Sequence, residues 1–402
     1  MLARCRVRRS EATPIATLPS PDRPVVLHVL PRLDSGGVER STVDLALGLD
    51  REGWRPVVCS AGGRMERRLV GGGVEHIGLP VASKSPLTMA LNVWRLKRLM
   101  AELRPTVVHV HSRAPAWSTA LAARSLGLPL VTTVHGLHGG ADRRLKRRYN
   151  AVMTSGDRVI AVSRHVADSV AERYGVPKDR IRMVHPGVDL GVFDPRRVRG
   201  DRVARLAERW GVDMDRKVVM LPGRISKGKG HLLLLRALAR LERQDVQVLL
   251  VGPQRPGDGY VDQIAALVRG TGLGDRVRFA GDCDDMPAAM ALADLVVLPA
   301  TAPEAFGIVV AEAQAMGKPV VVTAMGGLAE TLMPGATGWL VKPDDPEELA
   351  WAIDLALKLE PGVKARLADR AREFVAGELA IERTRQRTAL VYEELRSTRA
   401  PG

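Results

Sequence analysis

The chain has 402 residues, 46% of them hydrophobic, so it is long enough to form two or three domains with separate cores. Its 60 Lys and Arg residues against 45 Asp and Glu residues give a net charge of +15, which favours an anionic partner such as a phosphorylated substrate, a membrane surface or nucleic acid. Aromatic residues make up only 3%, too few for the stacking platforms of a single-stranded nucleic-acid binder, so no nucleic-acid partner is expected. The three cysteines are far apart and predict neither a disulfide framework nor a metal site, which indicates a reducing, cytoplasmic environment.

The first part of the chain, residues 1–23, predicts a disordered basic tail. It contains arginines and prolines but no apolar stretch of signal-peptide length. No segment reaches the roughly 18 apolar residues of a membrane span. The sequence therefore predicts a cytoplasmic protein, either soluble or bound peripherally to the inner face of the cytoplasmic membrane.

From residue 24 onward, short Val- and Leu-rich runs alternate with longer amphipathic stretches. The runs VVLHVL, RPVVCS, TVVHVH, PLVTTVH and RVIAVS are followed by KVVMLPG, VQVLLVG, VRFAG, DLVVLP and PVVVT in the second half. Uninterrupted apolar strands alternating with helices are typical of parallel, doubly wound sheets. The sequence predicts two Rossmann-like α/β domains, over 24–195 and 196–375, and a final helix over 376–402 that packs back toward the first domain through one face.

In the first domain, the candidate ligand-binding residues follow the ends of predicted strands. Gly36 and Gly37 stand between the first strand and the first helix, where a ligand can lie against the backbone beside a helix N-terminus; a tight turn without a ligand explains a lone glycine pair equally well. His135 ends a buried strand just before Gly136 and is the better functional candidate among the histidines. His109 lies inside a strand, which is more typical of a core histidine with satisfied hydrogen bonds.

A basic segment follows over residues 139–153. Its basic side chains crowd onto one expected helix beside Leu145, Tyr149 and Val152; they are Arg143, Arg144, Lys146, Arg147 and Arg148. Such a helix can lie on an anionic bilayer, each basic residue contributing on the order of 1 kcal/mol. A merely solvated helix face explains the same pattern, so both interpretations stay open.

In the second domain, the segment LPGRISKGKG follows a strand and opens a helix. Its glycines, including Gly223, let the backbone approach a ligand, and Arg224 and Lys229 lie in the same loop. Two cations and the amides of a helix N-terminus can hold a diphosphate. The segment is not a Walker loop, because the GxxxxGK[ST] pattern is absent. A basic surface turn is the alternative.

The segment PEAFGIVVAEAQAMGKPVVV over residues 303–322 places Glu304 and Glu312 eight positions apart. It predicts a helix from near Gly307 to Met316, which ends at Gly317. Glu304 then lies in the loop before the helix and Glu312 lies within it. The positions expected to meet a ligand at the helix N-terminus are Phe306, Gly307, Ile308 and Val309.

Taken together, these segments resemble retaining glycosyltransferase family 4, over about residues 25–375. The most specific element is the E-x7-E pattern EAFG…EAQAMGKPVV…GG…ETLMPGATGWLVKP, and four further motifs occur in the family's order: SGGVER, TVHG, HPGVDLGVFDP and LPGRISKGKG. The resemblance implies the glycosyltransferase-B fold, in which two doubly wound Rossmann-like domains face each other across a cleft. Ala305 and the pair His185 and Pro186 depart from the usual pattern, but neither change removes a charged group.

The resemblance also implies roles for the candidate residues. Glu312 would accept hydrogen bonds from the nucleotide ribose, and Glu304 would contact the hydroxyls of the donor sugar. Arg224 and Lys229 would neutralise the leaving diphosphate, as a divalent metal does in other enzymes, so no metal and no cofactor are expected. His135 would lie near the reacting centre. No protein nucleophile is assigned, because retention in this family is ascribed to same-face attack assisted by the leaving phosphate.

The function that the resemblance implies is the transfer of a sugar, typically a hexose, from a UDP- or GDP-sugar to a saccharide of the cell envelope. The acceptor expected from the basic charge is lipid-linked, such as a lipopolysaccharide core or a polysaccharide precursor, and Gly37 would allow the β-phosphate or the acceptor to approach. A glycosyltransferase with a soluble acceptor and a nucleotide-sugar epimerase of the same fold are the alternatives. A non-catalytic nucleotide-sugar sensor ranks below them.

Overall fold

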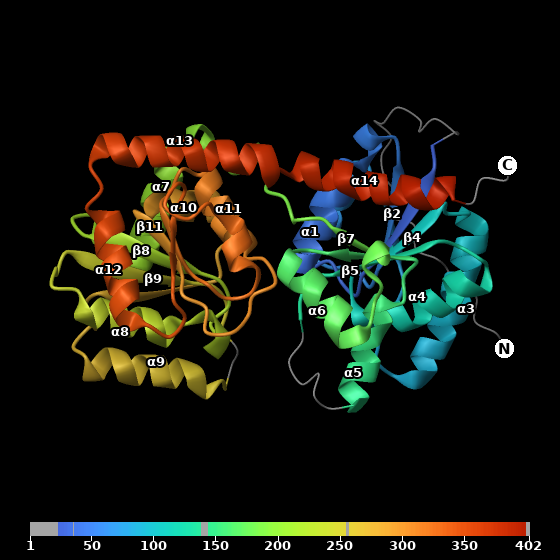
Figure 1. The fold of residues 1–402 in the computed structure, drawn as a ribbon, viewed down its shortest axis with the longest axis horizontal. Helices are drawn as coiled ribbons and strands as arrows, with labels where there is room; N and C mark the ends of the chain where they lie inside the picture. Colours follow the sequence, from blue (N-terminus) through green and yellow to red (C-terminus); the bar gives the residue numbers. More distant parts are fainter. Residues whose placement is uncertain (1–22, 35, 138–143, 255–256, 399–402) are drawn as a thin grey trace. The chain divides into compact units, whose positions relative to one another are not determined.

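A computed structural model describes residues 23–34, 36–137, 144–254 and 257–398, drawn as a ribbon in Figure 1; the predicted tail lies outside this range apart from Arg23. The chain forms two compact units: unit 1 is Met1–Gly187 with Ile381–Gly402, and unit 2 is Val188–Ala380. The first limit falls eight residues before the predicted 195/196, and the second falls five residues after the predicted 375/376. The chain passes from one unit to the other at Val188 and again at Ala380. Val188 donates its backbone N–H to the carbonyl of Leu379 at 2.8 Å and forms a β-bridge with Ala380, so these two passages of the chain are hydrogen-bonded to each other.

Unit 1 is built on a seven-stranded parallel sheet with the strand order β3-β2-β1-β4-β5-β6-β7. The predicted apolar runs form five of these strands, and the two outermost strands, β3 and β7, are additional to the prediction. Because helices cover both faces of a parallel sheet, its central strands are buried throughout. The strands are β1 (Val25–Val29), β2 (Arg55–Ser60), β3 (Glu75–Gly78), β4 (Val107–Val110), β5 (Leu130–Val134), β6 (Arg158–Ala161) and β7 (Ile181–Met183).

The helices of unit 1 include one that follows unit 2 in the sequence. They are α1 (Gly37–Ala46), α2 (Glu66–Gly71), α3 (Pro86–Leu103), α4 (Arg113–Ser125), α5 (Arg144–Asn150), α6 (Arg164–Tyr174) and α14 (Ile381–Ser397), with the 3₁₀ turns η1 (Leu49–Glu52), η2 (Ala151–Thr154) and η3 (Lys178–Arg180). Helix α14 buries residues spaced three and four apart, which gives it one apolar face.

The core of unit 1 joins this last helix to the sheet. Tyr392 and Leu395 of α14 pack with Trp54 and with Val26 of β1, and the rings of Trp54 and Tyr392 meet edge to face at 5.1 Å. Polar contacts reinforce the apolar ones, since Arg385 donates to the backbone carbonyl of Asp44 at 2.7 Å. Removing Tyr392 would leave a large cavity, and such truncations cost about 3–5 kcal/mol in protein cores.

Unit 2 repeats the architecture with a six-stranded parallel sheet in the order β10-β9-β8-β11-β12-β13. Its strands are β8 (Lys217–Pro222), β9 (Val246–Val251), β10 (Val277–Gly281), β11 (Leu295–Leu298), β12 (Val320–Thr323) and β13 (Trp339–Val341), the last additional to the prediction. Its helices are α7 (Gly200–Trp210), α8 (His231–Arg240), α9 (Gly259–Gly270), α10 (Met286–Leu292), α11 (Ile308–Ala315), α12 (Pro346–Leu357) and α13 (Pro361–Glu378), with the turns η4 (Pro195–Arg197), η5 (Lys227–Lys229) and η6 (Gly327–Thr331).

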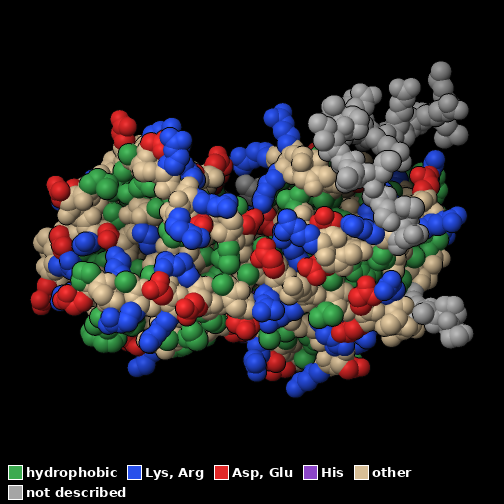
Figure 2. Space-filling view, turned by 90° about the horizontal axis from the view of Figure 1, so that it is seen from above, with side chains coloured by type: hydrophobic (Ala, Val, Ile, Leu, Met, Phe, Trp, Pro, Cys, Tyr) green, Lys and Arg blue, Asp and Glu red, His purple; other side chains and the backbone are tan. Residues whose placement is uncertain are grey.

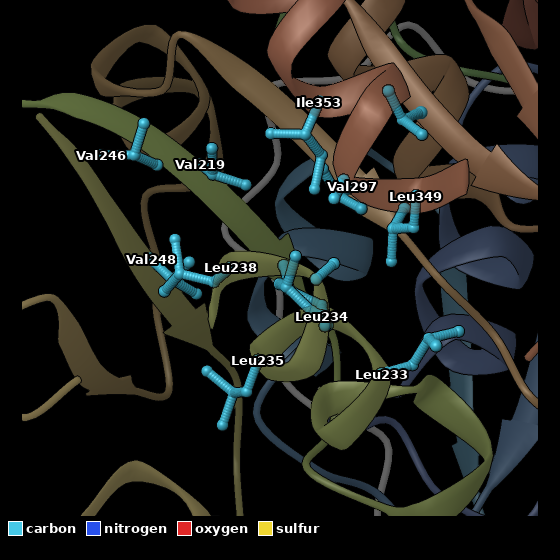
Figure 3. Close-up of a cluster of buried hydrophobic side chains, with 14 of the residues drawn as sticks. Val219, Leu233, Leu234, Leu235, Leu238, Val246, Val248, Val297, Leu349 and Ile353 are labelled. Atoms are coloured by element: carbon cyan, nitrogen blue, oxygen red, sulfur yellow. The ribbon is translucent and has the colours of Figure 1, made fainter. Parts of the chain in front are cut away.

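One face of this second sheet packs against α8 and α12. Leu234 and Leu238 of α8 meet Val219 and Val248 of the sheet, and Leu349 of α12 completes the cluster (Figure 3). All of these side chains are essentially inaccessible to solvent. Each buried Val or Leu side chain contributes about 1.5–3 kcal/mol, so this packing fixes the strand ends that carry the site.

In both sheets the strand order reverses next to the first strand of the unit. The reversal falls between β1 and β4 in unit 1 and between β8 and β11 in unit 2. In doubly wound sheets, ligands bind outside the carboxyl ends of the strands at this switch point. The prediction of two parallel, doubly wound sheets is therefore confirmed. Within the part of the chain that is described, no helix is both long and apolar enough to cross a membrane.

Candidate active site

The predicted site residues fall into two groups, one at the switch point of each unit. In unit 2, the loop between β8 and α8 carries the predicted cations. Gly223 (φ 132°) and Gly230 (φ 76°) take backbone conformations that favour glycine, and a Cβ on Gly230 would clash with the carbonyl of Pro299. The side chain of Lys229 lies over Gly223, within ordinary contact of where a Cβ would stand. The glycines thus let the loop fold closely over the sheet edge.

Lys229 meets one of the two predicted carboxylates. Its Nζ lies 2.9 Å from Oε1 of Glu304, and the two side chains are 24% and 23% exposed. The backbone of Glu304 is held by a bridge to Gly326 (φ 63°) and by the N–H of Gly327, which donates to its carbonyl at 2.7 Å. A Cβ on Gly326 would overlap the backbone of Glu304, so this glycine is required for the close approach. The ion pair is therefore positioned by the backbone rather than by chance surface contact.

Helix α11 starts directly after this loop, one residue later than predicted. Its N-cap is Gly307 (φ 81°), which offers no side chain to the first amides of the helix. Ile308 and Val309 in the first turn are half-buried, whereas Phe306 is buried. Uncapped amides and the helix dipole together favour an anion at this end.

The remaining predicted residues of unit 2 differ in accessibility. Glu312 lies within α11 as predicted and is buried, with 3% exposure. Arg224 is exposed and forms no hydrogen bond or ion pair with another described residue, which leaves its guanidinium available to a ligand. The structure therefore joins Lys229 to Glu304 directly.

In unit 1, the switch point opens into a cavity of about 200 Å³. Val38, in the first turn of α1 after Gly36 and Gly37, borders the cavity together with His135, Gly136 and residues of α6. Val38 and His135 thus border one cavity, whereas Gly36 and Gly37 are not among the described residues that line it.

Two arginines that the sequence analysis does not select also line this cavity. Arg113 begins α4 directly after β4 and donates from Nη1 to Oδ1 of Asn150 at 2.8 Å, and Arg173 reaches it from α6. Burial lowers the pKa of Arg113, and the nearby Tyr149 and Tyr174 oppose this effect. Among the described residues, no Asp or Glu lines the cavity. The cavity thus has cationic walls without a compensating carboxylate.

Behind His135, two more histidines form what we call the histidine row. Nε2 of His135 lies 3.2 Å from Nδ1 of His111, and Nε2 of His111 lies 3.0 Å from Nδ1 of His28. His28 and His111 are buried, while His135 is half-buried against the cavity. Burial lowers the pKa of His28 to about 3 and that of His135 to about 4, and it lowers that of His111 well below its ordinary value. All three are neutral at pH 7.

His109 stands beside the histidine row but belongs to the core. Its two ring nitrogens lie 2.6 Å from the hydroxyls of Tyr392 and Thr133, and it is 1% exposed, as expected for a core histidine with satisfied hydrogen bonds. The ring nitrogens of His28, His109 and His111 come within 4.8 Å of one another, a spacing that can hold a metal ion. Because both nitrogens of His109 already have hydrogen-bond partners, hydrogen bonding accounts for this cluster without a metal.

The predicted basic helix is α5, shorter than the predicted 139–153, and Arg143 lies outside the described residues. Arg144, Lys146, Arg147 and Arg148 are all exposed, and so is Leu145 (84%). A solvated face and a membrane-binding face both require this exposure, so membrane binding stays a prediction. On the face that Figure 2 shows, basic and acidic side chains are interspersed.

Comparisons with known proteins agree with this arrangement. Residues 35–192 match the model of Glycosyltransferase Family 4, and residues 204–374 match that of Glycosyl transferases group 1. A relative from Mycolicibacterium vanbaalenii, D-inositol 3-phosphate glycosyltransferase, is 32% identical over 89% of this chain and 87% of its own. The crystal structure of a glycosyltransferase from Rickettsia africae is similar with a TM-score of 0.84 and 30% identity, over 93% of this chain and 99% of that one.

A third comparison concerns the fold alone. Anabaena HepE, solved in complex with UDP and glucose, matches with a TM-score of 0.78 and 24% identity over 92% of this chain and 99% of that one.

Two parallel doubly wound units with polar residues at both switch points define a two-domain nucleotide-sugar transferase of the glycosyltransferase-B fold. The chain belongs to glycosyltransferase family 4, a family of retaining enzymes.

Proposed function

We propose that the enzyme transfers a sugar from a UDP- or GDP-sugar to a small, soluble, anionic acceptor, with retention at the anomeric carbon. The observation that carries the choice of acceptor is the cationic cavity of unit 1. Arg113 and Arg173 line it without an opposing carboxylate among the described residues, and about 200 Å³ suits a compact molecule. An uncompensated, half-buried guanidinium is stabilised by an anion that reaches it, which points to an acceptor with a phosphate or similar group.

The relatives support the same direction. The Mycolicibacterium protein is named for D-inositol 3-phosphate, which is a compact, water-soluble polyol with a phosphate. A lipid-linked saccharide acceptor has less support. It depends on the exposed basic residues of α5, and a solvated helix face explains their exposure equally well. We therefore place the soluble acceptor first.

On the donor side, we assign the roles that the family resemblance implies. Lys229 and Arg224 would hold the diphosphate at the start of α8, and the amides of Ile308 and Val309 would add a second contribution from α11. Glu304 would bind the sugar hydroxyls and Glu312 the ribose. Glu304 compensates the charge of Lys229 through their ion pair, and donor binding would replace this pair with contacts to the diphosphate and sugar. These charges would stabilise the leaving group without a metal ion.

A donor and acceptor assay tests the proposal. The full chain is incubated with UDP-glucose, GDP-mannose and related donors, each with D-inositol 3-phosphate or with inositol that lacks the phosphate. We expect nucleoside diphosphate release and a glycosylated product by mass spectrometry, at least about tenfold faster with the phosphorylated polyol, since a charge-assisted contact contributes about 1.5–3 kcal/mol. Transfer to lipid-linked saccharides alone would contradict the acceptor, and conversion of the donor without any acceptor would indicate an epimerase.

A thermal-shift screen identifies the donor independently of the acceptor. A nucleotide sugar at 100 times its Kd stabilises the folded protein by about 2.7 kcal/mol. We expect the cognate UDP- or GDP-sugar to raise the melting temperature more than its free sugar does. Equal shifts with ADP, UDP and GDP sugars would show that the base is not read.

A further inference from the structure

The histidine row crosses three neighbouring strands of unit 1. His28 lies within β1, His111 follows β4 and His135 follows β5, and β1, β4 and β5 are adjacent in the sheet. The ring nitrogens follow one another at 3.0 and 3.2 Å. The row therefore runs from the interior of the sheet to the cavity and ends there at His135.

Two hydrogen bonds between three neutral imidazoles allow only two proton arrangements. Each ring has one N–H, and His111 must donate with one nitrogen and accept with the other. In the first arrangement all three rings carry the proton on Nδ1, so His28 donates to His111 and His111 donates to His135. In the second all three carry it on Nε2, and every bond is reversed. A doubly protonated His111 is excluded at neutral pH because burial disfavours its charged form.

The inner end of the row decides between the two arrangements. Nε2 of His28 is fully buried and has no hydrogen-bond partner among the described residues. In the second arrangement this nitrogen would be a buried N–H without an acceptor, and orphaned buried N–H groups are rarer than under-satisfied acceptors. The first arrangement leaves only an unused lone pair there. At the outer end, it leaves the proton of His135 on Nδ1, which makes no hydrogen bond to a described residue.

We propose that His111, backed by His28, is a positioning residue that fixes His135 as the Nδ1–H tautomer, so that His135 donates a hydrogen bond to a substrate oxygen in the cavity. His135 therefore acts as a neutral donor rather than as a base. The tautomer follows from the geometry of unit 1 alone, and only the identity of the oxygen rests on the proposed function. A sugar or polyol hydroxyl, which is neutral and can accept, fits such a donor.

Nitrogen NMR of the full chain, labelled with ¹⁵N at histidine, tests the tautomer directly. Protonated and unprotonated ring nitrogens have well-separated chemical shifts, and the His135 signals are assigned by their loss in His135→Gln. At pH 7.5 we expect the proton on Nδ1 in His28, His111 and His135, whereas free neutral histidine mostly carries it on Nε2. A proton on Nε2 of His135, or zinc bound in stoichiometric amount to this cluster, overturns the proposal.

Two variants of the middle histidine link the tautomer to activity. His111→Gln keeps an amide N–H that can donate to His135 and a carbonyl that can accept from His28, whereas His111→Leu keeps neither. We expect kcat to fall about tenfold in His111→Leu with the KM for the nucleotide sugar unchanged, and to stay within about threefold of the original in His111→Gln. Another buried histidine of unit 1 provides the control, and His76→Gln should leave kcat and the His135 signals unchanged.

The outcomes separate this inference from the proposed function. An Nδ1–H tautomer in a protein that transfers to no phosphorylated polyol keeps the inference and rejects the acceptor. Equal kcat for His111→Leu and His111→Gln rejects the positioning role even if the acceptor is correct. If His111→Leu does not fold, the spectrum of the unmodified protein still decides the tautomer.

Discussion

Units 1 and 2 share one architecture but place different chemistry at the switch point of the sheet. In unit 2, full charges meet near solvent, where Lys229 and Glu304 form an ion pair with about a quarter of each side chain exposed. In unit 1, neutral imidazoles joined by hydrogen bonds lead from the interior to a cavity. A diphosphate requires opposing charge, whereas a hydroxyl requires an oriented neutral group. The comparison shows that the sheet supplies the position and that the residues after each strand supply the chemistry.

The largest expected effect concerns the charged site of unit 2. Lys229→Met should lower kcat/KM by about 10²–10³, because the leaving diphosphate loses a preorganised cation, a loss of the size measured for a single transition-state donor.

The two carboxylates of the same unit should differ in their effects. Glu304→Gln should mainly lower kcat, and Glu312→Gln should mainly raise the KM for the donor, each by about tenfold or more. Steady-state kinetics with Lys227→Met, an exposed neighbour, as the control measure these changes. Wild-type kcat and KM in both carboxylate variants would remove the donor-site assignment.

The next effect concerns the cationic cavity of unit 1. Arg113→Gln should raise the KM for a phosphorylated acceptor by roughly 10- to 100-fold, because one charge-assisted hydrogen bond is lost. Donor binding, measured by titration with the nucleotide sugar, should not change. Arg98→Gln removes an exposed arginine of α3 that does not line the cavity and serves as the matched control. An unchanged acceptor KM in Arg113→Gln would place the anion elsewhere.

The next effect concerns stability at acidic pH, which we expect to fall more steeply in unit 1 than in unit 2. The folded pKa values of His28 and His135 lie at about 3 and about 4, and those of His109 and His111 lie well below 6.5, whereas an unfolded histidine titrates near 6.5. Between these values the unfolded state binds more protons, so stability is lost as pH falls below 6.5, by up to about 1.4 kcal/mol per pH unit for each histidine.

Hydrogen exchange resolves this acid effect by region. In unit 2, His231 is the described histidine whose pKa burial lowers, to about 4, so its acid dependence should be shallower. We expect peptides of β4 and β5 to lose protection between pH 6.5 and 4.5 before peptides of β8 and β11 do. Parallel loss in both units would show that the buried histidines do not control acid stability.

The smallest expected effect is that of removing divalent metal. On the proposed donor assignment, Lys229 and Arg224 would carry the charge that a metal supplies to the diphosphate in other enzymes, so we expect the same activity in EDTA and in Mg²⁺ or Mn²⁺ within experimental error. The assay uses the cognate donor and acceptor at saturating concentrations. Strict dependence on either metal would show that the two cations do not suffice.

Much of this structure can be predicted from the sequence where one local signal is enough. Ten strands follow from uninterrupted apolar runs, and α11 follows from its glycine borders. Three strands, β3, β7 and β13, cannot be found this way, because each is short, lies at the edge of a sheet and is only partly buried, so its residues are mixed in polarity.

The residues of the candidate site also differ in whether a local sequence signal predicts them. Glu304 and Lys229 belong to motifs that are contiguous in the chain. Arg113 follows directly after a predicted strand, so the rule that selects His135 could have selected it too. The contact between His28 and His111, however, joins residues 83 positions apart, and no local pattern reports it.

The placement of α14 also affects how the protein is made. Unit 2 is one continuous piece of chain, but unit 1 needs residues from both sides of it, and its helix α14 is synthesised after unit 2. At translation rates of about 5–20 residues per second, the roughly 190 residues of unit 2 take roughly 10 to 40 s to synthesise. During that time the apolar surface around Trp54, which Tyr392 and Leu395 later cover, stays open on the nascent chain. Unit 1 therefore comes first in the sequence but is the last to complete its core.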